Sequence, residues 1–356
     1  MSVNIRELAE VAAKVRASDI FLKAGSQPMM RLHGKINTLG EHAPLTAEEV
    51  QEVAYGIMSH DQIGRFERRH ELDLAFQIDG LARFRVNIYQ QRGTMGMVLR
   101  IIPLDIYTLD DLAMPEAIRG FTEQRQGLVL VTGPTGCGKS TTLAAMIHEI
   151  NGKRRDNIVT IEDPIEFVHP DRKAIINQRE IGIDTDSFTD ALKYVLRQSP
   201  DVILVGEMRD VETMNVALAA AETGHLVYST VHTSSAAETL DRIVNMFPPH
   251  DKPIICMRMS VSLKGIVSQK LIPRSDKAGR VAAVEIMVAN PTIQKLLEEG
   301  RSGQIYQAIQ EGDFWGMQTM NQCLDRFYKA GIISQEEALA NAGNETELRQ
   351  MMRRTH

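Results

Sequence analysis

Apolar side chains in the N-terminal part of the chain recur at helical spacing in three places. The first set predicts an amphipathic helix and consists of Ile5, Leu8, Ala9, Ala12 and Val15. The second follows Thr46, which can cap a helix, and Glu49 three residues later completes a capping box. A further helix is predicted over residues 61–69. Helices therefore account for only part of this region.

Strand periodicity accounts for the rest of the N-terminal part. The runs "DIFLKAG" and "PMMRLHGKINTLG" predict short strands, with a hairpin turn at His33-Gly34. From Leu72 to Ile102 the apolar period becomes two, with Asp79-Gly80 as a turn and a last strand in "GMVLRIIP". An α+β domain over residues 1–102 is the prediction.

The pattern changes after a mixed segment, residues 103–120, which we predict to be a linker. Continuous apolar runs follow in "GLVLVTG", "NIVTIED", "AIINQRE", "DVILVGE" and "HLVYSTVH". Helical patterns alternate with them over residues 139–150, 188–198 and 211–221. Such strands between helices predict a buried, largely parallel sheet with helices on both faces. Residues 121–356 are thus predicted to form an α/β domain, mostly helical from Ser235 onward.

Composition narrows the class of protein. A chain of 356 residues exceeds what one core usually supports, and 43% hydrophobic with 24% charged residues is typical of a soluble globular protein. The net charge of -6, with scattered basic residues, disfavours a nucleic-acid partner. Three separated cysteines form no metal-ligand or disulfide pattern, which indicates a reducing cytoplasm. No apolar run reaches the roughly 20 residues that cross a bilayer, so any membrane role is peripheral.

The strongest chemical motif follows the apolar strand "GLVLVTG". The sequence "GPTGCGKS" satisfies GxxxxGK[ST], and a helical pattern follows it. Glycines allow backbone N–H groups to approach a phosphate, and the helix N-terminus adds partial positive charge. Lys139 should reach the β- and γ-phosphates and Ser140 should bind Mg²⁺. The predicted ATP-binding residues are Gly133, Pro134, Thr135, Gly136, Cys137, Gly138, Lys139, Ser140 and Thr141.

Cys137 lies within this loop and permits two interpretations. A thiol at a helix N-terminus can have a lowered pKa and act as a redox switch. A small residue is also tolerated wherever only the backbone contacts the phosphate. We favour the second interpretation for Cys137.

Acidic residues follow two of the predicted strands, where a P-loop protein needs a carboxylate for Mg²⁺ or for the attacking water. "DVILVGEMRD" places Glu207 after a buried strand. "TIEDPIEF" places Glu162, Asp163 and Glu166 after another. A solvent-exposed acidic cluster is the alternative, and the position directly after a strand favours function.

Two histidines and two arginines are weaker candidates. His225 and His232 bracket "HLVYSTVH", and the second ends a strand in the manner of a γ-phosphate sensor, although a packed histidine is the alternative. Arg83 and Arg85 share one strand face, opposite to apolar neighbours. Such a pair is commonly just solvated, but in a ring it could reach a neighbouring subunit's nucleotide.

An ordered set of motifs carries a resemblance over nearly the whole chain. The motifs are "GPTGCGKSTTLAAM", "TIEDPIEFVH", "QREIGIDTDSF", "LRQSPDVILVGEMRD", "AETGHLVYSTVHTSSA" and "GMQTMNQCL". Together they resemble the type IV pilus retraction ATPases, the PilT and PilU group of the secretion ATPase superfamily. The resemblance implies a hexamer whose subunits join a PAS-like N-terminal domain to a RecA-like ATPase domain with C-terminal helices.

Site roles also follow from the resemblance. It implies that Glu166 is the general base and that Glu207 is an atypical Walker B glutamate associated with Mg²⁺. His225 and His232 match the family's His box, and Arg83, Arg85 and Arg100 match arginines that reach the nucleotide in the ring. The implied partner is a PilC-like platform protein at the cytoplasmic face of the inner membrane.

One segment departs from the PilT pattern. Where PilT proteins carry an arginine-containing "AIRNLIRE"-like segment, this chain has "PTIQKLLEEGR", residues 291–301. The departure leaves open a PilU-like accessory role, in which the chain docks on a PilT paralogue and depends on it. A DNA-translocating ATPase of the same superfamily is a third alternative, which the net charge of -6 disfavours.

Overall fold

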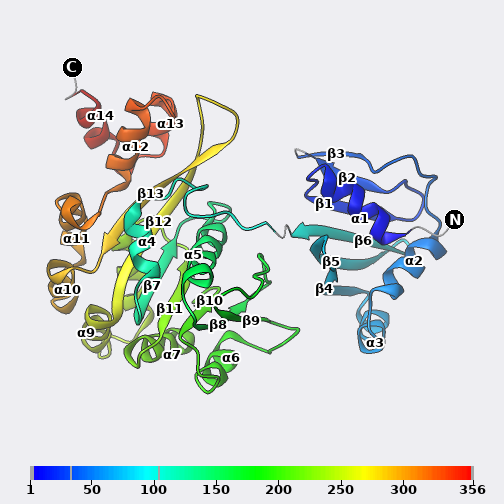
Figure 1. Ribbon diagram of the computed structural model, residues 1–356, viewed down its shortest axis with the longest axis horizontal. Coiled ribbons are helices and arrows are strands. Elements are labelled where there is room, and N and C mark those ends of the chain that lie inside the picture. Colours follow the sequence, from blue (N-terminus) through cyan, green and yellow to red (C-terminus); the bar gives the residue numbers. More distant parts are fainter. Residues whose placement is uncertain (1–3, 33, 103–104, 354–356) are drawn as a thin grey trace. The chain divides into compact units, whose positions relative to one another are not determined.

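The computed structural model describes residues 4–32, 34–102 and 105–353 (Figure 1). They divide into two compact units. One comprises the residues up to Asp105 with Glu166–Val168, and the other comprises Ile106–Ile165 and the residues from His169 onward. His33, one of the two residues of the predicted His33-Gly34 turn, lies outside the described residues. So do Pro103 and Leu104, the first two residues of the predicted linker.

The described residues of the first unit form an antiparallel sheet with three helices (Figure 1). Its strand order is β3-β2-β1-β6-β5-β4. The strands are β1 (Asp19–Lys23), β2 (Met29–Leu32), β3 (Lys35–Thr38), β4 (Glu71–Ile78), β5 (Ala82–Gln91) and β6 (Thr94–Ile102). The helices are α1 (Ile5–Lys14), α2 (Ala47–Gly56) and α3 (His60–Arg69). These elements confirm the predicted helices and strands of the N-terminal part.

Side-chain alternation in β5 gives this sheet one buried face. Phe84, Val86 and Ile88 are fully buried, whereas Arg85 between them is exposed. The predicted capping box of α2 is also present, since Thr46 accepts from Glu49 N–H and the Glu49 carboxylate accepts from Thr46 N–H. Local sequence signals therefore predicted correctly which face of β5 is buried and where α2 begins.

The second unit contains a seven-stranded sheet of order β13-β12-β7-β11-β10-β8-β9. Its strands are β7 (Gly127–Thr132), β8 (Asn157–Glu162), β9 (Ile175–Glu180), β10 (Val202–Val205), β11 (Leu226–Val231), β12 (Leu263–Pro273) and β13 (Arg280–Val288). The pairs from β12 to β9 are parallel, and β13 adds to the edge in antiparallel sense. The prediction of a largely parallel sheet is confirmed.

Helices cover both faces of this sheet (Figure 1). The helices near one face are α4 (Glu116–Thr122) and α5 (Lys139–Lys153). Those on the other side are α6 (Phe188–Val195), α7 (Val211–Glu222), α8 (Ala236–Met246), α9 (Lys252–Ser262), α10 (Pro291–Glu298) and α11 (Ile305–Gln310). Leu128 and Leu130 of β7 pack in the core with helices α6 to α11. Val129 and Val131 of the same strand pack in the core with α4 and α5. One buried strand thus supplies both layers, because successive side chains point to opposite faces.

The C-terminal part differs from the prediction over two strands. The helices α12 (Met320–Lys329), α13 (Gln335–Ala340) and α14 (Glu345–Arg353) agree with it, but β12 and β13 lie in the region predicted as mostly helical. The helical prediction was wrong there because apolar residues in β12 recur at three- and four-residue intervals, which imitates a helix. These residues are Leu263, Ile266, Val267, Leu271 and Ile272.

The described residues of the predicted linker belong mainly to the second unit. Leu109 and Ile118 are almost fully buried in the same core as α5. From Ile106 onward this segment is therefore a packed piece of the second unit rather than a free connection.

Candidate nucleotide-binding site

The loop between β7 and α5 has a backbone that requires glycine. Gly133, Gly136 and Gly138 have φ angles of 142°, 78° and 92°. A Cβ on Gly133 would lie 2.4 Å from the carbonyl oxygen of Gln269, so no other residue fits there without a shift. The glycines of the motif thus shape the loop that the sequence predicts to cradle phosphate.

The start of α5 fits an anion. Gly138 occupies the N-cap position and supplies no side-chain acceptor, so the first-turn N–H groups lack a side-chain cap. The ammonium of Lys139 donates to the carbonyl oxygens of Gly133 at 2.9 Å and Pro134 at 3.1 Å, and the residue is buried. Ser140 and Thr141 follow in the first turn and are partly exposed. Backbone donors and a cation are thus concentrated at one loop.

A chain of polar contacts runs from the loop to two neighbouring strands. Lys139 Nζ lies 3.4 Å from His232 Nδ1, His232 Nε2 lies 3.2 Å from Glu207 Oε1, and Arg209 lies 2.7 Å from Glu207 Oε2. His232 follows β11 and Glu207 follows β10, at the carboxyl ends of adjacent parallel strands. Because an ammonium can only donate, Nδ1 accepts and Nε2 carries the hydrogen that faces Glu207. The structure therefore brings together three of the predicted site residues.

The electrostatics of Glu207 favour a carboxylate. Burial pushes the pKa of Glu207 upward, but the hydrogen bond and charge of Arg209, with a smaller contribution from His232, outweigh it. The pKa of Glu207 consequently lies below its ordinary value. An ionised group is available for a divalent cation.

Gln269 of β12 holds the back of the loop. Its Nε2 donates to Cys137 O at 2.7 Å and its Oε1 accepts from Thr142 Oγ1 at 2.8 Å. Sequence reasoning missed Gln269 because β12 lies in the region predicted as helical. Arg209 was also missed, although its place two residues after Glu207 in "GEMRD" was a usable signal.

Cys137 is packed against the loop from inside. Its side chain is 3% exposed, and burial raises the pKa of the thiol although Lys139 acts in the opposite direction. A buried thiol of raised pKa is a poor nucleophile. The geometry favours the structural interpretation of Cys137 over a redox switch.

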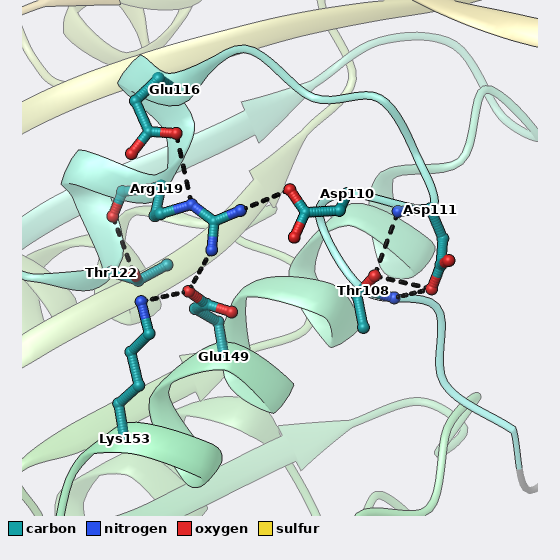
Figure 2. A network of polar contacts seen from close by, with 8 residues as sticks. All are labelled: Thr108, Asp110, Asp111, Glu116, Arg119, Thr122, Glu149 and Lys153. Atoms are coloured by element: carbon teal, nitrogen blue, oxygen red, sulfur yellow. Dashed lines mark hydrogen bonds and ion pairs between the residues drawn. The ribbon is translucent and has the colours of Figure 1, made fainter.

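The far half of α5 is anchored by charge (Figure 2). Arg119 of α4 forms ion pairs with Asp110, Glu116 and Glu149, and Lys153 forms a second ion pair with Glu149. Glu149 and Lys153 belong to α5, whereas Asp110 precedes α4. The helix that starts at the phosphate loop is thereby fixed to the segment that opens the second unit.

The three acidic residues at and after the end of β8 lie in different environments. Glu162 accepts hydrogen bonds from Thr160 at 2.6 Å and Gln178 at 3.1 Å, which stabilise the end of the strand. Asp163 precedes Pro164 through a cis peptide bond. Glu166 is exposed in the connection from β8 to β9. Exposure leaves its carboxylate available to water and substrate.

His225 lies away from the loop. It precedes β11, while His232 follows the same strand. The six extended residues of β11 separate the two histidines by roughly 20 Å. His225 therefore lies at the amino end of the strand, whereas the phosphate loop lies at the carboxyl end. Its Nδ1 contacts Ala220 O at 3.0 Å. The structure does not bring His225 to the predicted phosphate site.

The three predicted arginines lie in the first unit. Arg85 of β5 is directly opposite Arg100 of β6, and Arg83 is two residues before Arg85 on the same face. Arg100 also donates to buried Asp19 at 3.0 Å, and Arg31 contacts the other oxygen of that carboxylate at 3.2 Å. Arg85 and Arg100 are exposed, which leaves their guanidinium groups accessible on this unit.

Comparison with known proteins decides the family. Residues 2–340 match the sequence model of type II/IV secretion system proteins. The chain belongs to this family. The chain is 47% identical to the type IV pilus retraction ATPase PilT of Pseudomonas aeruginosa over 340 residues. The alignment covers 96% of this chain and 98% of that protein. It is 40% identical over 351 residues to the type IV pilus ATPase PilU of the same organism, covering 99% and 92%.

Solved structures of the secretion family agree. The crystal structure of the pilus retraction motor PilT with bound ADP matches with a TM-score of 0.91 at 43% identity, covering 98% of this chain and 99% of that one. The Legionella pneumophila ATPase DotB matches with a TM-score of 0.81 at 29% identity, covering 94% and 93%. The predicted family and fold class, a PAS-like α+β part followed by a RecA-like ATPase part, are confirmed. Among the described residues, no helix is both long and apolar enough to span a bilayer.

Proposed function

We propose that this chain is the subunit of a hexameric motor that hydrolyses ATP to drive type IV pilus retraction. The observation that carries the proposal is the full-length likeness to PilT, combined with a loop, a cation and a carboxylate at one edge of the sheet. The motor acts from the cytoplasmic face of the inner membrane on a PilC-like platform protein. ATP hydrolysis around the ring drives pilins out of the fibre.

The residues fit ATP and Mg²⁺ in the following way. The loop from Gly133 to Gly138 and the start of α5 hold the phosphates, and Lys139 leaves the loop carbonyls for the β- and γ-phosphates. Ser140 and Glu207 hold Mg²⁺, which neutralises phosphate charge when bound. Glu166 accepts a proton from the attacking water, and His232 senses the γ-phosphate through its contact with Lys139.

The proposed ring requires groups from a second subunit. Arg83, Arg85 and Arg100 stabilise charge that develops on the γ-phosphate of a neighbouring subunit. Two exposed arginines directly opposite each other on the first unit support this assignment, because like charges in that position cost stability.

ATP turnover by the purified full-length protein tests the site. We expect Lys139→Ala to abolish nucleotide binding and Glu166→Gln to lower kcat at least about 100-fold while retaining ADP binding. Lys14→Ala in α1 and Glu52→Gln in α2 are matched controls on exposed groups and should behave as wild type. Wild-type kcat in Glu166→Gln would remove that residue from the mechanism.

A second candidate is a PilU-like accessory ATPase that depends on a PilT paralogue. The 40% identity to PilU over 351 residues and the altered segment at α10 favour it. In a strain that carries both genes, deletion of this one should then leave retraction partly intact when a PilT paralogue remains. Complete loss of retraction under those conditions excludes the accessory role.

A further inference from the structure

The connection from β8 to β9 spans the length of two parallel strands without forming a helix or strand. The two strands are parallel, with Asn157 opposite Ile175 and Glu162 opposite Glu180, so the chain must return along the full length of the pair. That length is roughly 20 Å for six residues. Residues 163–174 make this return without a helix or strand of their own. Their backbone groups therefore depend on partners elsewhere.

Asn151 of α5 supplies such partners at the end of the return. Its Nδ2 donates to Pro170 O at 2.7 Å, its Oδ1 accepts from Arg172 N–H at 3.1 Å, and its main-chain oxygen accepts from Lys173 N–H at 3.0 Å. The Asn151 side chain is fully buried. A carboxamide is suited to this position because it donates and accepts at once.

Strand β9 holds the earlier part of the same connection. The Ile165 N–H donates to Glu180 Oε2 at 3.3 Å, and the His169 N–H donates to Gln178 Oε1 at 2.8 Å. Glu166 lies between these two fixed points in the chain. The Asn151 contacts then join the connection to α5, the helix that begins at Lys139.

We propose that Asn151 is a positioning residue that keeps the connection bearing Glu166 in register with the phosphate-binding helix. The inference rests on the proposed function, in which Glu166 acts on water beside a phosphate held at the start of α5. Removal of the carboxamide leaves Pro170 O and Arg172 N–H without their buried partner, and the connection loosens. The segment that carries Glu166 then loses its anchor on α5, whereas the phosphate loop itself is unchanged.

The test compares kcat with nucleotide affinity in the full-length protein. Asn151→Ala should lower kcat at least about 10-fold, because small misplacements of a catalytic group are costly. The ADP dissociation constant should stay within about twofold, since the loop is untouched. Asn151→Asp should be intermediate, because it still accepts from Arg172 N–H but cannot donate to Pro170 O when ionised.

Asn321→Ala is the matched control. Asn321 of α12 is also buried and donates to Asn344 O and Glu347, while accepting from Gly343 N–H at 3.0 Å. It should lose stability as Asn151→Ala does, yet keep wild-type kcat. Amide hydrogen exchange over residues 163–173 should accelerate in Asn151→Ala alone.

Three results overturn the proposal: wild-type kcat in Asn151→Ala, an equal loss of kcat in Asn321→Ala, or unchanged exchange over residues 163–173. Failure of the proposed base is a separate result. If Glu166→Gln turns over normally while Asn151→Ala lowers kcat and accelerates exchange in the connection, the assignment of Glu166 as the base fails. The exchange result then still shows that Asn151 holds the connection to α5, whereas wild-type exchange in Asn151→Ala would overturn the role of Asn151 itself.

Discussion

Side chains at the carboxyl edge of the second sheet form a directional series of hydrogen bonds. Lys139 donates to His232, which donates to Glu207, which accepts in turn from Arg209. If a phosphate draws Lys139 away, His232 Nδ1 loses its donor and the imidazole can reorient. The occupancy of the loop is thereby linked to the carboxylate assigned to Mg²⁺.

Arg209 lowers the pKa of Glu207 and thereby affects the lowest pH at which that side chain is a carboxylate. Burial alone would raise the pKa of Glu207, and Arg209 is the main group that lowers it. In Arg209→Gln the pKa of Glu207 should rise, so the carboxylate protonates at a higher pH and the acidic limb of kcat/KM moves upward. A pH profile of ATP turnover measures the shift. Arg349→Gln, which removes an exposed ion pair with Glu345 in α14, should leave the limb in place.

At the scale of elements, α5 carries three functions along its length. Its N-terminus forms the phosphate loop with β7 and β12, Asn151 contacts the connection after β8, and its last turns join the ion pairs around Arg119 (Figure 2). Substitutions along α5 should separate these functions from one another.

Two glycines of this region distinguish loop geometry from helix stability. Gly133→Ala places a Cβ against Gln269 O at a φ of 142°, so it should abolish nucleotide binding and destabilise the fold by more than about 1 kcal/mol. Gly152→Ala lies within α5, and apart from its chain neighbours and the nearby backbone of the helix no heavy atom lies within 4 Å of the new Cβ. It should raise the free energy of unfolding by about 0.5–1 kcal/mol. Urea unfolding and ADP titration measure both, and a binding defect in Gly152→Ala would contradict this assignment.

Local chemistry explains which elements the sequence could predict. The capping box at Thr46, the alternation around Arg85 and the strand–loop–helix at Lys139 depend on neighbours in the chain, and all three were predicted correctly. The roles of Gln269 and Asn151 depend on contacts with distant segments, which no periodicity encodes. His225 illustrates the same limit, because a motif placed it with His232 while the strand between them separates the two.

At the scale of the whole molecule, the proposed ring explains an otherwise costly arrangement. Arg85 and Arg100 face each other across β5 and β6, and Asp19 offsets only part of this charge because it also pairs with Arg31. Function in the assembled motor is a reason to keep such a pair. The subunit alone then holds an incomplete catalytic site.

Mixed rings test whether Arg85 acts across subunits. Lys139→Ala and Arg85→Ala rings should each be inactive, but random mixing at equal amounts pairs an intact loop with an intact arginine at about a quarter of the interfaces. ATP turnover should therefore return after subunit exchange, which native mass spectrometry can follow. A mixture of Lys139→Ala and Glu166→Gln should stay inactive, because we assign both residues to the same subunit's contribution to a site. Absence of recovery in the first mixture, despite confirmed exchange, would place Arg85 within its own subunit's site or outside the mechanism.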